Sequence, residues 1–190
     1  GDYLSAIDYQ TRSLTIFNEI GEKNAIARCL SIFSSIYSDK GEYNRAMEYS
    51  RRALIIREET GDQDGVATSF DYVGYIYLKQ NAIDSSRTYF EKSLAIKNNM
   101  VSSADELLWS TTNLYLTYKN LGIEYDEKEI RILLNEAENI EFGLNYALYL
   151  LLEDTSCLET AYNQVQEKAD NLEPDVKLKF LSYPIPKAIV

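Results

Sequence analysis

The chain repeats itself with a period of forty residues. Gly1–Lys40 and Gly41–Gln80 carry identical residues at twelve aligned positions. These positions are Gly1/Gly41, Tyr3/Tyr43, Ala6/Ala46, Tyr9/Tyr49, Arg12/Arg52, Leu14/Leu54, Ile16/Ile56, Glu19/Glu59, Gly21/Gly61, Ala27/Ala67, Ile36/Ile76 and Tyr37/Tyr77. A period of this length indicates one supersecondary unit that is copied and stacked, each copy burying its apolar face on its neighbours. The repeat therefore predicts an array of such units and favours a binding scaffold.

Each copy holds two helical patterns. Apolar side chains recur at helical spacing along both, and the small Ala6 and Ala46 allow a neighbouring helix to approach closely. Gly21, Gly41 and Gly61 stand where a glycine commonly ends a helix. The helices expected from these signals are Asp2–Ile20, Asn24–Asp39, Glu42–Thr60, Asp64–Lys79 and Ala82–Asn98.

Helix signals continue where the repeat decays. Capping boxes at Ser103–Glu106 and Ser156–Glu159 each predict a helix start. Phe142–Leu152 is apolar and uncharged, but its eleven residues are too few for a membrane span, which needs about twenty, so we expect it in the core. Pro174 suits the first turn of a last short helix, which Tyr183–Pro186 ends. We expect nine long helices, one short helix and no strand.

The repeat also suggests a division of the chain. The expected segments are 1–122 with well-formed units, 123–172 with degenerate helices similar to the repeats, and 173–190 with a capping helix and a tail. The first segment begins with the second helix of a unit. Tyr3, Ile7, Leu14 and Phe17 would then lack the preceding helix that covers them. We therefore expect a fragment of a larger array that can self-associate through this uncapped helix.

Composition excludes several classes of function. The chain has 30 acidic and 19 basic residues and a net charge of −11, so it suits a basic protein or peptide better than nucleic acid or an anionic membrane. It has no histidine, which removes the common nucleophile pairs and imidazole metal sites. Cys29 and Cys157 are far apart and read as reduced thiols in a cytoplasmic protein. We expect no enzymatic activity, no cofactor and no metal.

The repeated positions resemble a known family. One unit is filled by Leu30, Phe33, Ser34, Tyr37, Gly41, Ala46 and Ala53, and the next by Phe70, Val73, Gly74, Tyr77, Asn81, Ser86, Phe90 and Ser93. With these residues the chain resembles the tetratricopeptide repeat family, in a lengthened form similar to the arrays of kinesin light chain and of bacterial Rap-type and sensor-regulator proteins. The resemblance implies an all-α, right-handed solenoid of stacked helix–turn–helix units that binds a protein or peptide in its concave groove.

The resemblance also implies which residues line the groove, because the first helix of each unit faces it in this family. The implied binding residues are Arg28, Ser35, Tyr72, Tyr75, Lys79, Trp109, Thr112, Asn113 and Lys119. Tyr72, Tyr75 and Trp109 would form an aromatic strip in a polar frame, which is typical of interface anchors. Asn113 takes the position where peptide-binding relatives often carry an asparagine, whereas Ile32 and Tyr72 hold that position in the other units.

Two alternatives stay open at this point. The aromatic side chains could pack between repeats instead of lining a binding surface. The chain could also be a sensory or regulatory segment of a multidomain bacterial signalling protein, in which ligand binding changes the pitch of the array and controls an attached effector.

Overall fold

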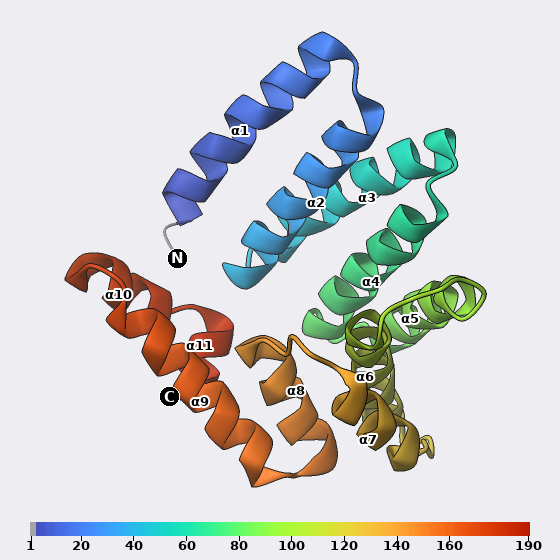
Figure 1. Cartoon of the computed structure of the whole chain (residues 1–190), viewed down its shortest axis with the longest axis vertical. Coiled ribbons are helices and arrows are strands. Elements are labelled where there is room, and N and C mark those ends of the chain that lie inside the picture. The colour runs from blue at the N-terminus through green and yellow to red at the C-terminus, as the bar shows by residue number, and fades with distance from the viewer. Residues whose placement is uncertain (1–2) are drawn as a thin grey trace. The chain divides into compact units, whose positions relative to one another are not determined.

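The computed structural model describes residues 3–190, so Gly1, which opens the repeat in the sequence, and Asp2 lie outside the described residues. This part of the chain contains eleven α-helices and no strand (Figure 1). The helices are α1 (Tyr3–Ile20), α2 (Lys23–Asp39), α3 (Tyr43–Thr60), α4 (Gln63–Lys79), α5 (Ile83–Lys97), α6 (Ala104–Leu121), α7 (Glu127–Glu136), α8 (Phe142–Leu152), α9 (Thr155–Asp170), α10 (Pro174–Leu181) and α11 (Pro184–Ile189). The predicted all-α class is confirmed, with one more short helix than expected.

The helices form two compact units, one that ends at Lys97 and one that spans Asn98–Val190. In the amino-terminal unit, α2 packs closely on α3 and α4 on α5, while α1 with α2 and α3 with α4 make the contacts between pairs. This pattern is the stacking of two-helix units that the repeat predicts. The predicted segments 1–122, 123–172 and 173–190 follow the quality of the repeat rather than this division, and they stay a prediction.

Left-handed backbone at the predicted glycines ends the repeated helices. The φ angles of Gly21, Gly41 and Gly61 are 75°, 77° and 72°. Glycine adopts this conformation without the steric cost that a Cβ atom brings. In the third copy Asn81 takes the same place with φ of 60°, and asparagine is one of the few other residues that tolerate it.

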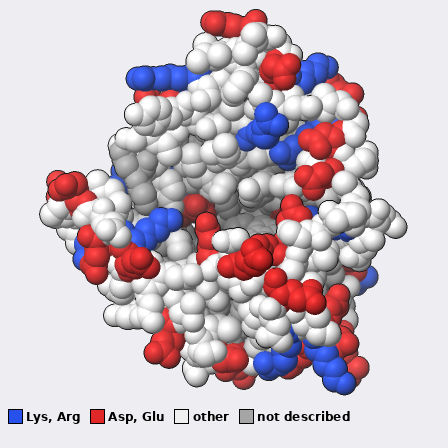
Figure 2. All heavy atoms as spheres, viewed as in Figure 1, with Lys and Arg blue, Asp and Glu red and all other residues white. Residues whose placement is uncertain are grey.

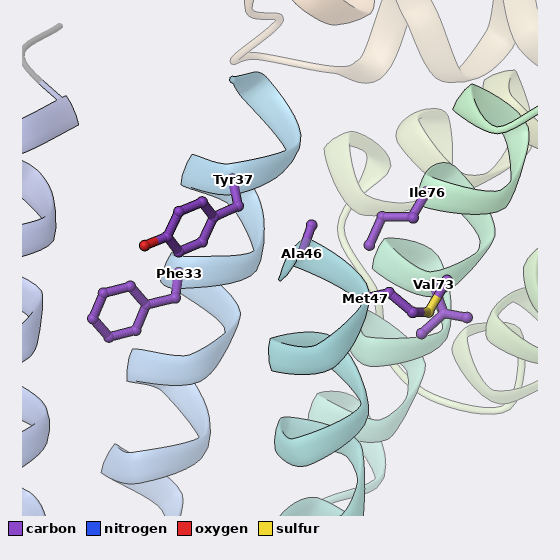
Figure 3. Packing of buried hydrophobic residues seen from close by; sticks show 6 residues of the cluster. All are labelled: Phe33, Tyr37, Ala46, Met47, Val73 and Ile76. Carbon is purple, nitrogen blue, oxygen red and sulfur yellow. The ribbon is translucent and has the colours of Figure 1, made fainter. Parts of the chain in front are cut away.

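The core of the amino-terminal unit lies where three consecutive helices meet. Its cluster consists of Phe33 and Tyr37 of α2, Ala46 and Met47 of α3, and Val73 and Ile76 of α4 (Figure 3). Small buried residues let α2 and α3 approach closely. Ala46 and Ala53 are fully buried, and the hydroxyl groups of Ser34 and Ser50 lie 2.6 Å apart across the α2–α3 contact. The small positions of the repeat therefore pack as the sequence predicts.

Helix α1 buries a different face from the one expected. Ile7 and Leu14 pack against the α2–α4 cluster, and Tyr3 and Phe17 are half-buried, so these side chains are not the uncovered face. The prediction was wrong because the apolar residues of α1 turn toward α2, its following neighbour. The exposed large apolar side chains of α1 are instead Leu4, Tyr9, Ile16 and Ile20.

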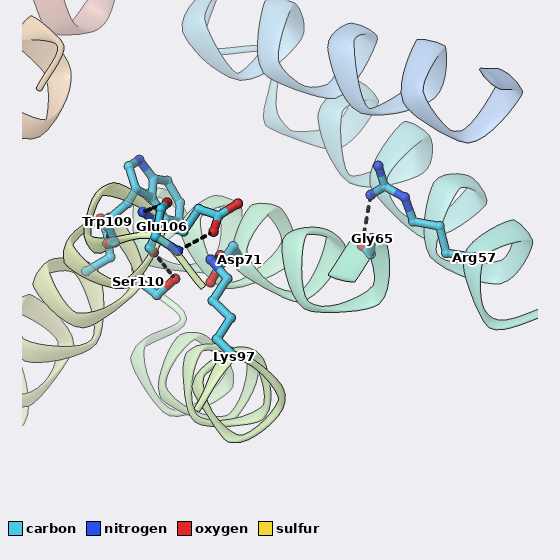
Figure 4. Close-up of polar contacts among 9 residues, drawn as sticks. Arg57, Gly65, Asp71, Lys97, Glu106, Trp109 and Ser110 are labelled. Atoms are coloured by element: carbon cyan, nitrogen blue, oxygen red, sulfur yellow. Dashed lines mark hydrogen bonds and ion pairs between the residues drawn. The ribbon is translucent and has the colours of Figure 1, made fainter. Parts of the chain in front are cut away.

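Two cations forty residues apart are buried against α4 (Figure 4). Arg57 of α3 donates hydrogen bonds from Nη1 to the Gly65 carbonyl at 3.0 Å and to Ser69 Oγ at 2.8 Å. Burial lowers the pKa of Arg57. Lys97 of α5 places Nζ 2.7 Å from Oδ2 of Asp71. Arg57 and Lys97 thus fasten the carboxyl ends of α3 and α5, the second helices of two successive copies, to α4.

Two helix starts in the carboxy-terminal unit show how side chains satisfy free backbone N–H groups. The predicted capping box of α6 is confirmed: Ser103 Oγ accepts from the Glu106 N–H at 3.2 Å, and Glu106 Oε2 accepts from the Ser103 N–H at 2.9 Å. The box predicted at Ser156–Glu159 is wrong. Asp154 caps α9 instead and accepts from the N–H and Oγ of Ser156, bonds that lower the pKa of Asp154. A carboxylate suits the positive end of a helix better than a hydroxyl does.

The carboxyl end of the chain also differs from the prediction. Tyr183–Pro186 was expected to end the last helix, but α10 already ends at Leu181 and Pro184 opens the further helix α11. Proline fits the first turn because the N–H that it lacks would have no partner there. The Phe142–Leu152 helix α8 lies in the core as expected, with Leu148 and Leu151 buried. No helix among residues 3–190 is both long and apolar enough to cross a membrane.

Candidate functional site

The predicted binding residues of the amino-terminal unit lie on its two first helices. Arg28 is exposed and Ser35 is half-buried on α2, whereas Tyr72 and Tyr75 are half-buried and Lys79 is exposed on α4. We call these five residues the α2–α4 surface. The spacing of three and four residues along α4 places its three side chains on one face, one turn after another.

An electrostatic contact on this surface joins two residues of α4. The Lys79 ammonium lies 5.0 Å from the centre of the Tyr75 ring, a cation–π distance. Desolvation raises the pKa of Tyr75, and the carboxylate of Asp39 on α2 raises it further. Protein atoms that exclude water near the Lys79 ammonium lower its pKa. The structure thus brings Tyr75 and Lys79 together, with a negative charge from α2 nearby.

A groove that the sequence did not indicate lies between α3 and the end of α4. Its volume is about 520 Å³, and its lining residues are Asn44, Met47, Glu48, Arg51, Arg52, Ile55, Tyr77 and Gln80. Arg51 donates to the Tyr77 hydroxyl at 3.1 Å, and Gln80 donates to Asn44 Oδ1 at 3.3 Å. The signal in the sequence that could have pointed here was the apolar Ile55 on a second helix. In the structure Ile55 lines the groove and is 55% exposed. We missed it because only the first helices were assigned to a binding surface.

The remaining predicted residues lie on α6, in the carboxy-terminal unit. Trp109 is half-buried, while Thr112 and Asn113 are buried. The Asn113 side chain donates to the Trp109 carbonyl at 2.8 Å, one turn back on the same helix. This bond occupies one donor of the amide that was expected to pair with a ligand backbone. Contact of these three residues with a partner stays a prediction.

Comparison with known protein families matches residues 35–99, about a third of the chain, to the tetratricopeptide repeat. This segment belongs to the tetratricopeptide repeat family. The match covers Ser35, Tyr72, Tyr75 and Lys79 as well as the groove between α3 and α4. No curated protein matches the chain. Tetratricopeptide repeats generally mediate protein–protein interaction, and their all-helical scaffold is typically non-catalytic.

Outside the matched repeats, Lys119 has a clear structural partner. Its Nζ donates to the carbonyls of Leu150 and Leu151 at 2.9 and 3.2 Å and to Glu153 Oε1 at 3.0 Å. Leu150 and Leu151 lie in the last turn of α8, and Glu153, which caps the helix, has a left-handed φ of 58°. A cation at the negative end of a helix is stabilising. Lys119 therefore fastens α8 to α6, whatever it does toward a partner.

We expect Lys119→Met to lower the free energy of unfolding of the carboxy-terminal unit by about 1–2 kcal/mol, since three charge-assisted hydrogen bonds are lost at a partly exposed site. Urea unfolding followed by Trp109 fluorescence measures the change, because this tryptophan reports on α6. Lys128→Met, at an exposed position of α7, is the matched control and should change stability by less than about 0.5 kcal/mol. Equal stability of the two variants would contradict the capping role.

Proposed function

We propose that the chain is a protein- or peptide-binding scaffold and that the α2–α4 surface takes part in binding. The observation that carries the proposal is the Tyr75–Lys79 pair on α4, in which the exposed Lys79 places its ammonium 5.0 Å from the centre of a half-buried aromatic ring. Tyr72 lies one turn earlier on the same face. Tyrosine offers a large contact area together with a polar tip, which makes it a frequent anchor in interfaces.

The charge of the chain supports a partner that is basic rather than acidic. Figure 2 shows acidic side chains across much of the face in view, with basic side chains in small separate groups. A net charge of −11 favours the approach of positively charged segments and disfavours phosphate-rich polymers. Binding of an extended peptide or an amphipathic helix on this surface requires no bond to be made or broken.

We expect Tyr75→Ala to weaken binding of a selected peptide by about 1–3 kcal/mol, as truncation of an interface anchor does. Peptides selected from a random phage library on the whole chain are the probe, and their dissociation constants are measured by fluorescence anisotropy. Tyr75→Phe keeps the ring and should retain most of the affinity. Tyr162→Ala removes an exposed tyrosine of α9, which is 45% exposed, and is the matched control.

The proposal fails if every selected peptide binds Tyr75→Ala and the wild-type chain equally well. It also fails if Tyr75→Ala unfolds the amino-terminal unit, measured by circular dichroism, without any separate loss of affinity, since the tyrosine would then be a packing residue. Trp109, Thr112 and Asn113 can be tested in the same way on the carboxy-terminal unit.

The regulatory alternative rests on one feature, the formation of two compact units by the chain. A sensor would have to change its shape on binding, whereas a scaffold would not. Small-angle scattering of the chain with and without a selected peptide separates the two functions. Cys29 and Cys157 are buried free thiols, which fit a reducing compartment, and we include a cytoplasmic location in the proposal.

A further inference from the structure

The groove between α3 and α4 is lined by residues that the α2–α4 surface does not contain. Its α3 side chains recur every three or four positions and therefore lie on one face of that helix. They include Asn44, Glu48, Arg51 and Ile55. The last turn of α4 adds Tyr77 to the lining. A volume of about 520 Å³ lies within the range of pockets that hold ligands.

The groove is positively charged, although the chain as a whole is acidic. Among the described residues that line it are two arginines, Arg51 and Arg52, and one carboxylate, that of Glu48. Arg52 pairs with Glu48 at 3.8 Å, and both side chains are more than half exposed. Such an exposed pair is weak. Arg51 is in no ion pair with another residue of 3–190, so its charge is left over.

The other copies of the repeat show that stacking does not require Arg51 or Ile55. The residues at the same two positions are Thr11 and Thr15 in the preceding copy and Glu91 and Ala95 in the following one. Helices α1 and α5 nevertheless pack on neighbouring helices as α3 does. A cation and a large exposed apolar side chain at these positions are therefore particular to α3, and a ligand accounts for both better than packing does.

Apolar surface borders the Arg51 guanidinium in the groove. Ile55, one turn later on α3, is 55% exposed, and Tyr77 is half-buried on α4. Arg51 donates to the Tyr77 hydroxyl at 3.1 Å, which holds the guanidinium next to this ring. A fixed cation beside apolar surface suits a ligand that carries a carboxylate close to an apolar side chain.

We propose that this groove binds an acidic segment of a partner protein, with an Asp or Glu side chain on Arg51 and an apolar side chain against Ile55 and Tyr77. Arginine can hold a carboxylate by two parallel hydrogen bonds, which adds specificity to the charge attraction. The net charge of −11 does not prevent this contact, because charges more than about 8 Å away are largely screened at physiological ionic strength. The groove thus forms a second surface, with a charge preference opposite to that of the proposed function and independent of it.

A subtractive selection yields peptides that depend on the groove. A random peptide phage library is first depleted on the whole chain with both Arg51→Thr and Ile55→Thr, and then selected on the wild-type chain. The double variant carries the residues of the preceding copy at two exposed positions, so its circular dichroism spectrum should match that of the wild type. We expect the selected peptides to contain an acidic residue near an aliphatic or aromatic one.

Fluorescence anisotropy of a fluorescein-labelled selected peptide then gives the dissociation constants. We expect Arg51→Thr to weaken binding at least about tenfold, as the loss of a charge-assisted hydrogen bond does, and Ile55→Thr to weaken it by a smaller factor. A peptide whose acidic residue is replaced by its amide should bind the wild type more weakly but bind Arg51→Thr with little further loss, because the two groups contact each other. Arg131→Thr removes the same charge from an exposed position of α7 and should leave the affinity unchanged.

Three results would overturn the proposal. The first is that no peptide remains after depletion, and the second is that the selected peptides lack acidic residues. The third is equal affinity of the selected peptide for Arg51→Thr and Arg131→Thr. Tyr75→Ala in the same assay separates the groove from the proposed function. A loss of affinity on Tyr75→Ala without a loss on Arg51→Thr would place the peptide on the α2–α4 surface and overturn the assignment of the groove alone.

Discussion

Lys97→Met is expected to lower the free energy of unfolding of the amino-terminal unit by about 3–5 kcal/mol. Lys97 and Asp71 are only 5% and 7% exposed, and their charged atoms are 2.7 Å apart. The variant removes the cation and leaves a carboxylate buried beside an apolar side chain. Desolvating a charge without its partner costs far more than the loss of an exposed ion pair.

A double variant separates the ion pair from simple packing. Lys97→Met combined with Asp71→Leu removes both charges, so it should be more stable than Lys97→Met alone. Urea unfolding by circular dichroism, together with hydrogen exchange of the α4 and α5 amides, locates the loss. Lys92→Met, an exposed position of the same helix, is the control and should cost about 1 kcal/mol or less. The expectation is refuted if Lys97→Met is as stable as Lys92→Met.

Phe90→Ala is expected to destabilise the same unit by about 3–5 kcal/mol, because a large aromatic side chain is removed from a packed interior. The Phe90 ring is fully buried. It lies directly against Gly74 of α4, which has no side chain of its own to fill the cavity. The cost of such a cavity is highest where the surroundings cannot collapse.

Thermal and urea unfolding of Phe90→Ala measure the effect, with Ile55→Ala as the matched control. Ile55 is 55% exposed on α3, so its truncation should cost less than about 1 kcal/mol. Phe90→Leu retains part of the volume and should fall between the two. If Phe90→Ala and Ile55→Ala unfolded at the same temperature and the same urea concentration, the α4–α5 contact would not be tightly packed.

The helices and their ends were predictable where the deciding interactions are local. Gly21, Gly41 and Gly61 have the left-handed backbone that their positions after each helix indicate. The capping box of Ser103 and Glu106 also formed as predicted, because both bonds join residues three apart. At α9 two local acceptors competed, and the charged Asp154 capped the helix in place of Ser156.

The candidate site was less predictable, because it depends on which long-range partner a side chain finds. The sequence placed Tyr75 and Lys79 one turn apart, and the structure brings them into contact. Nothing local indicated that Lys119 would reach the end of α8, more than thirty residues away. The Asn113 amide likewise bonds to its own helix, a choice that the residue type does not reveal.

The forty-residue repeat by itself determined the helical class, the pairing of helices and the small residues at their contacts, because these follow from periodicity and from backbone conformation. Tertiary structure alone decided which polar side chains are buried and which apolar ones remain exposed. Lys97 and Lys92 look equivalent in the sequence, yet Lys97 is buried against Asp71, whereas Lys92 is exposed and lies over the Tyr89 ring. Tyr9 and Tyr49 are identical in the repeat, yet Tyr9 is 69% exposed and Tyr49 stacks on Phe33 of α2. The physical reason is that the burial of a side chain depends on the residues that surround it in the fold, and its position in the repeat does not specify those residues.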